Sequence, residues 1–176
     1  MIYSIDTKHS YLEFSIKHMM ISKVRGTFLM KPSTLELDPE DWTTAEIDLS
    51  VDVKSIDTRN EKRDAHLMSS DFFDAVAFPN MHFTSLEIKA KGSYQYAVTG
   101  ELSIHGVTKQ ETFQMKYEGK AKDVHGTAKI GISGSGVIKR SDYGLTYNAA
   151  LETGGMMLGD EVEITIAIQA IEDRTL

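Results

Sequence analysis

The chain has 176 residues, of which 41% are hydrophobic, with three prolines and no cysteine. This size suits one domain over residues 1–176 that buries most of its apolar surface. The lack of cysteine excludes disulfides, thiolate zinc sites and a cysteine nucleophile. Because the formal net charge of −7 would repel a phosphate backbone, we expect no nucleic-acid partner.

The N-terminal residues bear on the cellular compartment. Residues 1–9 show no basic start followed by an apolar run, which a secretory signal would require. No segment reaches about 18 consecutive apolar residues, the usual minimum for a membrane-spanning helix. We therefore expect a cytoplasmic protein that does not span a membrane.

Alternating apolar and polar residues indicate the first strands. Residues 12–18 alternate, as do residues 24–30, and Leu35 and Leu37 fit a continuation of the second strand after a bend. Residues 45–53 alternate without a break, which is the pattern of a strand with one face in a core and the other in water. This part of the chain is therefore predicted to form three strands.

A short helix is predicted after the third strand. Residues 55–57 break the two-residue period, and Thr58 stands three positions before Glu61, which is the spacing of a capping box. The charged segment that follows is expected to form the helix. Residues 70–74 fit a further short turn of helix.

The second half of the chain carries further strand patterns. The strand over residues 81–90 changes its alternation between Phe83 and Leu86, so we expect a β-bulge there. The loop over residues 140–160 is long for a compact domain, which indicates that it is functional or folded onto the strands. The other strand patterns cover residues 94–104, 113–117, 128–136 and 162–168.

These patterns predict an all-β domain with one or two short helices between strands. About eight sequential antiparallel strands with short connections can close into a barrel, which removes both exposed edges. At this strand number the interior is filled by side chains or holds one small ligand. A two-layer sandwich is the alternative, because it also buries one face of every strand.

Small residues fall on the inward faces of the predicted strands. A glycine within a strand marks a bend, a bulge or the close approach of another group to the backbone, and a ligand cavity is the other interpretation of small inward residues. The sequence leaves these interpretations open. The residues concerned are Gly26, Ala45, Gly100, Gly134 and Gly136.

Methionine and phenylalanine residues are candidates for an adaptable apolar interior. The nine methionines include the adjacent pairs Met19-Met20 and Met156-Met157. Their flexible thioethers suit either an irregular core or an adaptable apolar pocket. Phe72 and Phe73 are expected to close one end of the barrel, since large aromatic side chains usually complete cores.

Basic side chains on the predicted helix are candidates for binding an anion. Arg63 and His66 lie three residues apart on one helical face, so both can present donors at the mouth of the barrel. The neighbouring carboxylates of Glu61 and Asp64 favour a structural interpretation, in which the charges pair with one another and hold the helix on the barrel. His18, on the inward face of the first strand, is a further polar candidate.

No residue pattern indicates catalysis, a metal site or a cofactor. Asp6, His9 and Ser10 are the residue types of an acyl-transfer triad, but neighbours on one short segment cannot align as nucleophile, base and orienting group. The six histidines show no metal-binding spacing. The glycine-rich residues 131–136 match neither a dinucleotide motif nor a phosphate loop. We therefore expect a protein that is not an enzyme and has no metal or cofactor.

Many short motifs occur in one order along nearly the whole chain. They are Asp6-x-x-His9-Ser10, Phe14-x-x-x-His18, Val24-x-Gly26-x-Phe28, Ser55-Ile56-x-Thr58, Arg63-Asp64-x-His66-Leu67, Asp71-Phe72-Phe73, Phe78-Pro79, Gly100-x-Leu102-x-Ile104-x-Gly106-Val107-Thr108 and Asp142-Tyr143-Gly144. Taken together, these motifs resemble the YceI-like family of polyisoprenoid-binding proteins. Residues 145–148 and 152–155 resemble the members without a secretory signal.

The resemblance has consequences for fold and ligand. It implies a lipocalin-like extended barrel of antiparallel strands with an elongated apolar cavity. It also implies a bound isoprenoid chain with a diphosphate or quinone head group, no established catalysis, and a homodimer.

The leading hypothesis is therefore a non-catalytic carrier or store for a long isoprenoid. At about 0.8 kcal/mol per buried CH₂, each five-carbon unit would contribute roughly 4 kcal/mol of gross transfer free energy. Polar contacts at the head group or the mouth are expected from His18, Arg63 and His66. The apolar lining is expected from Phe14, Ile16, Phe28, Ile47, Leu49, Phe83, Tyr96, Leu102, Ile132 and Ile164.

Two other functions stay open on the sequence alone. An acid–base enzyme acting on prenyl or other apolar substrates would use Asp6, His9, Asp64 and His66. A solid barrel without a ligand would serve as an interaction module, with residues 140–160 as its contact surface.

Overall fold

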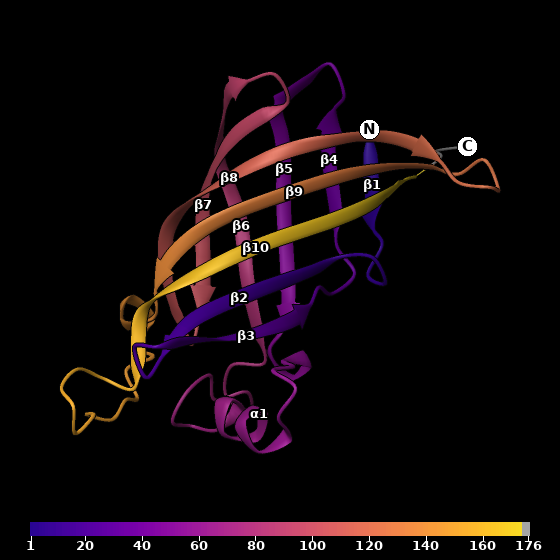
Figure 1. Cartoon of the computed structure of the whole chain (residues 1–176). Coiled ribbons are helices and arrows are strands. Elements are labelled where there is room, and N and C mark those ends of the chain that lie inside the picture. Colours follow the sequence, from indigo (N-terminus) through magenta and orange to yellow (C-terminus); the bar gives the residue numbers. More distant parts are fainter. Residues whose placement is uncertain (174–176) are drawn as a thin grey trace.

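The computed structural model describes residues 1–173, and β-strands make up most of the chain (Figure 1). The strands are β1 (Ile2–Ile5), β2 (Tyr11–His18), β3 (Ser22–Leu29), β4 (Thr34–Asp38), β5 (Asp41–Asp52), β6 (Asn80–Gly92), β7 (Gln95–Ile104), β8 (Val107–Lys122), β9 (Ala128–Lys139) and β10 (Leu158–Glu172). The helices are the 3-10 helix η1 (Val53–Ser55), the α-helix α1 (Glu61–Met68) and the 3-10 helix η2 (Arg140–Tyr143).

The strands form one antiparallel sheet that closes into a ring. Their hydrogen-bonded order is β1-β4-β5-β6-β7-β8-β9-β10-β2-β3, and an additional pairing between β1 and β10 closes the ring. Strand β10 has two partners on the same side, since residues 158–167 pair with β2 and residues 170–172 pair with β1. The predicted all-β antiparallel barrel is therefore confirmed, and the two-layer sandwich is excluded.

The β2–β3 hairpin completes the barrel wall at the end that carries α1. Isolated bridges join Thr27 to Asp57 and Met30 to Val51, so β3 meets the end of β5 and the segment that follows it. At the other end of the barrel, β1 fills the corresponding position between β4 and β10. Figure 1 shows α1 beyond the strand ends on the side of β3.

Residues 1–173 contain ten strands, whereas the sequence patterns predict about eight. The difference comes from β1, with four residues, and β4, with five, which are too short to show a convincing alternation. The expected bulge between Phe83 and Leu86 is confirmed, because the register of β6 against β7 shifts between Ser85 and Glu87. The predicted fold class is unchanged by the two additional strands.

The helix α1 is present as predicted, but Thr58 is not part of a capping box. Asn60 is the N-terminal cap, and its side-chain oxygen accepts a hydrogen bond from the amide of Arg63 at 3.0 Å. Thr58 instead donates its hydroxyl and its backbone amide to the Asp64 carboxylate. The capping-box prediction is wrong because Asn is among the strongest N-caps and directly precedes the helix. Residues 70–74 contain turns and no helix.

Large side chains from neighbouring strands cover the inward glycines. A Cβ atom on Gly26 would overlap the ring of Phe14, which stands directly opposite it in the β2–β3 register. The large side chains therefore lie along the barrel wall and leave its centre open. An added Cβ atom would likewise overlap the side chain of Phe83 at Gly100, of Met115 at Gly134 and of Phe113 at Gly136.

Three half-buried aromatic rings cluster at the end of the barrel remote from α1. The Trp42 ring lies 4.7 Å from that of Tyr117 and 6.1 Å from that of Tyr96, measured between centroids. Trp42 stands near the start of β5, whose other end leads towards α1. Trp42 and Tyr117 also pack against the hydrophobic core, so side chains occupy this end of the barrel.

Replacing Gly136 with alanine is expected to destabilise the barrel. The added Cβ atom would lie 2.5 Å from Cδ1 of Phe113, whose ring is packed in the core. Overpacking of this kind costs about 1–3 kcal/mol, which chemical denaturation would measure. Gly131 on the same strand is the control, because an added Cβ there meets only the Cβ of Glu118, at 3.4 Å. Equal losses in the two variants would contradict this explanation.

Candidate functional site

The barrel encloses a cavity of about 460 Å³ on the side of α1. This volume lies within the range of about 300–1,000 Å³ that is typical of small-molecule sites. Several lining side chains point inward yet keep exposed surface, because they border the hollow interior instead of packing against other side chains. These residues are Leu12, Phe14, Ile16, Val24, Ile47, Leu49, Phe73, Phe83, Met115, Val162 and Ile166.

The structure brings together all but one of the residues predicted to line the cavity. Tyr96 is the exception, since its half-buried ring belongs to the aromatic cluster with Trp42. That prediction is wrong because alternation gives the inward face of a strand but not the position along the barrel axis. The predicted residues that do line the cavity are Phe14, Ile16, Phe28, Ile47, Leu49, Phe83, Leu102, Ile132 and Ile164, together with His18, Arg63 and His66.

The cavity reaches the surface beside α1. Three of its lining residues at this end are themselves exposed: His66 on α1, and Tyr147 and Met157 on the loop before β10. The Tyr147 ring connects the two sides, because it packs against His66 and Phe72 with centroids 4.9 Å apart in each case. We call this opening, between α1 and the loop, the mouth.

Arg63 and His66 both bind neighbouring protein groups. The Nε atom of Arg63 donates to the Thr58 hydroxyl at 2.8 Å, and its Nη2 atom donates to the Thr58 carbonyl oxygen at 2.7 Å. The Nε2 atom of His66 lies 2.8 Å from a carboxylate oxygen of Asp71. These contacts favour the structural interpretation of the helix charges, in which they hold the segment around α1 in place.

His18 differs from Arg63 and His66 because its ring has no protein partner within residues 1–173. Its backbone carbonyl oxygen accepts a hydrogen bond from the Ser22 hydroxyl at 3.3 Å, at the turn of the β2–β3 hairpin. The half-buried ring lines the cavity. A neutral imidazole carries one donor and one acceptor, so His18 can offer a hydrogen bond to a molecule in the cavity.

Arg140 also lines the cavity, and the sequence analysis missed it. Its side chain is 7% exposed. Its Nε atom donates to the carbonyl oxygen of Gly159 at 2.8 Å, and its Nη1 atom donates to those of Leu145 at 2.7 Å and Tyr147 at 2.9 Å. Burial lowers the pKa of Arg140, and the nearby Asp160 opposes this shift. In the described part of the chain, no hydrogen bond engages its Nη2 atom, so that donor is free for a ligand.

Two further contacts anchor the loop over residues 144–157. Before it, the buried Tyr143 donates its hydroxyl to the Glu111 carboxylate at 2.8 Å. Burial raises the pKa of Tyr143, and the bond to Glu111 raises it further. Within the loop, the Asn148 side chain binds the backbone of Leu158, which directly follows the loop. Its amide nitrogen donates to the Leu158 carbonyl oxygen at 2.8 Å, and its oxygen accepts from the Leu158 backbone amide at 2.9 Å. The loop is therefore an ordered part of the mouth.

The residues considered for an acyl-transfer triad do not converge. His9 Nδ1 lies 2.9 Å from the Asp6 carboxylate, but the buried Ser10 hydroxyl bonds to the backbone of Gln169. No Asp or Glu residue of the described chain is among those that line the cavity. His66, which does line it, lies against the exposed carboxylate of Asp71.

Residues 1–173 contain neither a metal-binding cluster nor a long apolar helix. No group of three or more His, Cys, Asp or Glu side chains in this range could hold a metal ion. The described helices include none with the length and apolar character needed to cross a membrane.

A closed antiparallel barrel with an apolar cavity that reaches the surface beside α1 defines a class of proteins that bind apolar ligands. Comparison with known sequences gives the family. The chain belongs to the YceI-like domain family, whose model matches residues 3–170. The resemblance drawn from the sequence motifs is confirmed.

Curated relatives include proteins of Staphylococcus aureus. The UPF0312 protein SAS2572 of strain MSSA476 is 39% identical over 162 residues, which cover 92% of each chain. The UPF0312 protein SA2479 of strain N315 is 40% identical over 162 residues, with the same coverage of 92% on both sides.

Similar solved structures support the barrel fold. The Campylobacter jejuni YCEI protein is 31% identical, with a TM-score of 0.74 and 90% of each chain covered. Burkholderia cenocepacia BcnA is 23% identical, with a TM-score of 0.79, over 94% of this chain and 98% of its own. A polyisoprenoid binding domain from Saccharophagus degradans, implicated in plant cell wall breakdown, is 17% identical, with a TM-score of 0.70, over 97% of this chain and 98% of its own.

Replacing Arg140 with methionine is expected to loosen the loop over residues 144–157. The change removes the donors of three backbone carbonyl oxygens. Unsatisfied buried acceptors cost about 1–3 kcal/mol, so the free energy of unfolding should fall by that amount and limited proteolysis should cut the loop faster. Exposed Lys139 is the control, and its change to methionine should alter stability by no more than about 0.5 kcal/mol. An Arg140→Met variant with unchanged stability and proteolysis would contradict this role.

Proposed function

We propose that the protein binds an isoprenoid chain inside the barrel and serves as its non-catalytic carrier or store. The observation that supports this proposal is the cavity of about 460 Å³ with a lining of aliphatic, phenylalanine and methionine side chains. An isoprenoid chain is apolar along its length and methyl-branched, so it can fill an irregular cavity of this kind without unpaired polar groups. The aromatic cluster around Trp42 would limit how far the isoprenoid chain extends into the barrel.

Burial of the chain would supply most of the affinity. Each five-carbon unit transferred from water contributes roughly 4 kcal/mol, at about 0.8 kcal/mol per CH₂. Four such units, about 16 kcal/mol in all, would exceed a typical association cost of about 4–15 kcal/mol. The head group therefore needs few polar partners, and the lining provides few.

The polar lining residues favour a head group at the mouth. His18, Arg140 and Tyr147 belong to the end of β2, to η2 and to the loop, all on the side of the opening. We propose that the His18 ring and the Nη2 atom of Arg140 hydrogen-bond the head group, because both lack a partner within the described residues. Arg63 and His66 would act mainly by holding the wall of the mouth.

The comparisons support the class of ligand. The neighbour from Saccharophagus degradans that is described as a polyisoprenoid binding domain shares the fold over 97% of this chain. A cytoplasmic location and a homodimer stay predictions from the sequence.

Solvent extraction or native mass spectrometry of the purified protein is expected to recover a prenyl lipid. A variant with a filled cavity should carry less of it, and Val162→Phe is suitable because Val162 lines the cavity on β10. Thr165→Phe is the matched control, since Thr165 is exposed on the same strand and does not line the cavity. Wild-type protein that is always empty and shows no binding of added geranylgeraniol would refute the proposal.

Replacing His18 with alanine tests the position of the head group. A lost hydrogen bond to a charged group costs about 1.5–3 kcal/mol, so binding of geranylgeranyl diphosphate should weaken by about tenfold or more. Binding of the uncharged geranylgeraniol should change less. Titration of both ligands into wild-type and variant protein measures the two effects, and an equal change for both would place the head group elsewhere.

A further inference from the structure

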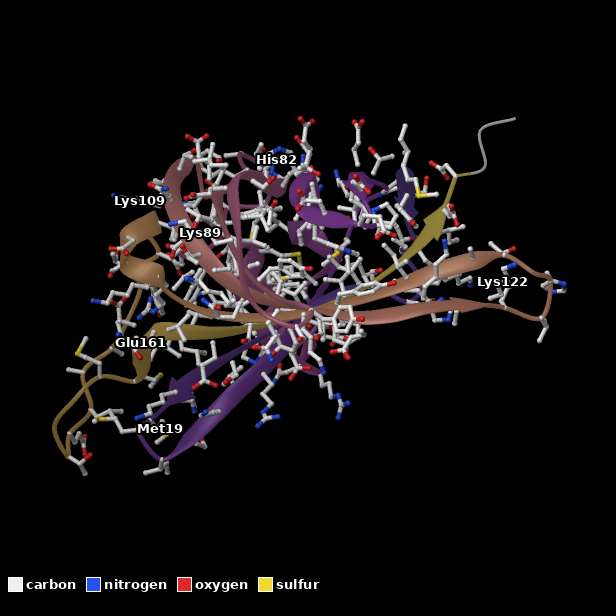
Figure 2. The ribbon with its side chains drawn as sticks, turned by 90° about the horizontal axis from the view of Figure 1, so that it is seen from above. Met19, His82, Lys89, Lys109, Lys122 and Glu161 are labelled. Carbon is white, nitrogen blue, oxygen red and sulfur yellow. The ribbon has the colours of Figure 1, made fainter. Side chains whose placement is uncertain are left out.

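Five exposed apolar side chains lie beside the mouth. Met19, Met20 and Ile21 form the turn of the β2–β3 hairpin and are 44%, 64% and 84% exposed. Met156 and Met157, in the loop before β10, are 47% and 37% exposed. We call these residues the methionine rim. Figure 2 shows Met19 next to that loop, at the opposite end of the molecule from Lys122.

Specific contacts assemble the rim from two segments that are far apart in the sequence. The amide of Met19 donates to the carbonyl oxygen of Met157 at 2.7 Å. The Met20 thioether lies against Gly155, where an added Cβ atom would overlap its sulfur. These contacts therefore hold the methionines together as one surface, and their side chains remain exposed to solvent.

The rim is continuous with the cavity. Met157 belongs to both, since it is exposed and also lines the cavity. The residues next to the rim in the sequence, His18 and Leu158, line the cavity as well. A ligand that passes through the mouth would therefore move along the rim.

We propose that the methionine rim docks on a lipid membrane and turns the mouth of the cavity towards the acyl chains. A contiguous exposed apolar surface is unfavourable in water and marks a contact site. An isoprenoid also dissolves in membranes far better than in water, so docking would let it enter the cavity without crossing the solvent. The identity of the ligand in this step rests on the proposed function, whereas the docking of the protein is inferred from the methionine rim alone.

The small size of the rim favours a membrane over a stable protein partner. Stable protein interfaces involve about 20–30 residues on each side and are anchored by Trp, Tyr and Arg. The rim consists of methionine and isoleucine, and flexible thioethers adapt to a fluid surface. Behind it, exposed Lys17 and Lys23 stand directly opposite each other in the hairpin, where they can approach anionic head groups. Lys23 also lies 3.3 Å from Glu163.

Cosedimentation with vesicles made of equal parts of phosphatidylcholine and phosphatidylglycerol tests the docking surface. The double variant Met20→Ser/Ile21→Ser should lower the partition coefficient of the protein by about tenfold or more, because two large apolar side chains no longer insert. Met156→Ser provides a second variant from the other segment. Val124→Ser is the control, since Val124 is 96% exposed in the β8–β9 hairpin, away from the rim.

Wild-type protein that does not bind the vesicles, or rim variants that bind as well as wild type, would overturn the proposal. A concentration-dependent dimer that the rim variants abolish, without any vesicle binding, would also overturn it and identify a second copy as the occupant. Denaturation curves that match wild type would show that the variants are folded.

A second measurement separates the docking surface from the proposed ligand. Geranylgeraniol is supplied either from these vesicles or dispersed in solution, and its uptake is followed over time. The rim variants should load several times more slowly from vesicles and equally fast from solution. Vesicle binding without uptake of geranylgeraniol from either source would support docking and refute the proposed ligand.

Discussion

The pairing of small residues with large ones on adjacent strands is the constraint on which the hollow barrel depends. A phenylalanine ring placed inward on every strand would meet other rings at the centre and fill it. Opposite Gly26, the Phe14 ring has room to lie along the wall, and Phe113 occupies the equivalent space at Gly136. The glycines thus allow bulky side chains to lie against the barrel wall, and the space left at the centre of the barrel is the cavity.

Sequence patterns predicted the faces of the strands well but not their positions along the barrel. Alternation depends on which side of a strand is buried, so Phe28 and Ile164 were correctly placed inside. It carries no information on depth, and for this reason it places Tyr96 in the cavity although Tyr96 packs with Trp42 at the end remote from α1. Short strands such as β1 contain too few residues to show a period at all.

The polar groups of the site were harder to predict because their availability depends on tertiary contacts. Arg63 was an obvious candidate from its place on a charged helix, yet Thr58 already accepts hydrogen bonds from its guanidinium. Arg140 carried no periodic signal, since its partners are backbone carbonyl groups of residues 145–159. His18 was identified through alternation, but only the folded structure shows that its ring has no partner within residues 1–173.

The shared strand β10 links the two ends of the chain. Tyr3 in β1 is registered against Glu172, while the earlier part of β10 holds the β2–β3 hairpin in the wall. Pairing over such long sequence separations is slow to form, because the chain must lose the entropy of loop closure before the stabilising contacts are made. During synthesis on the ribosome, the barrel therefore stays open along one side until β10 has emerged, and a lipid can be enclosed only once that strand has paired.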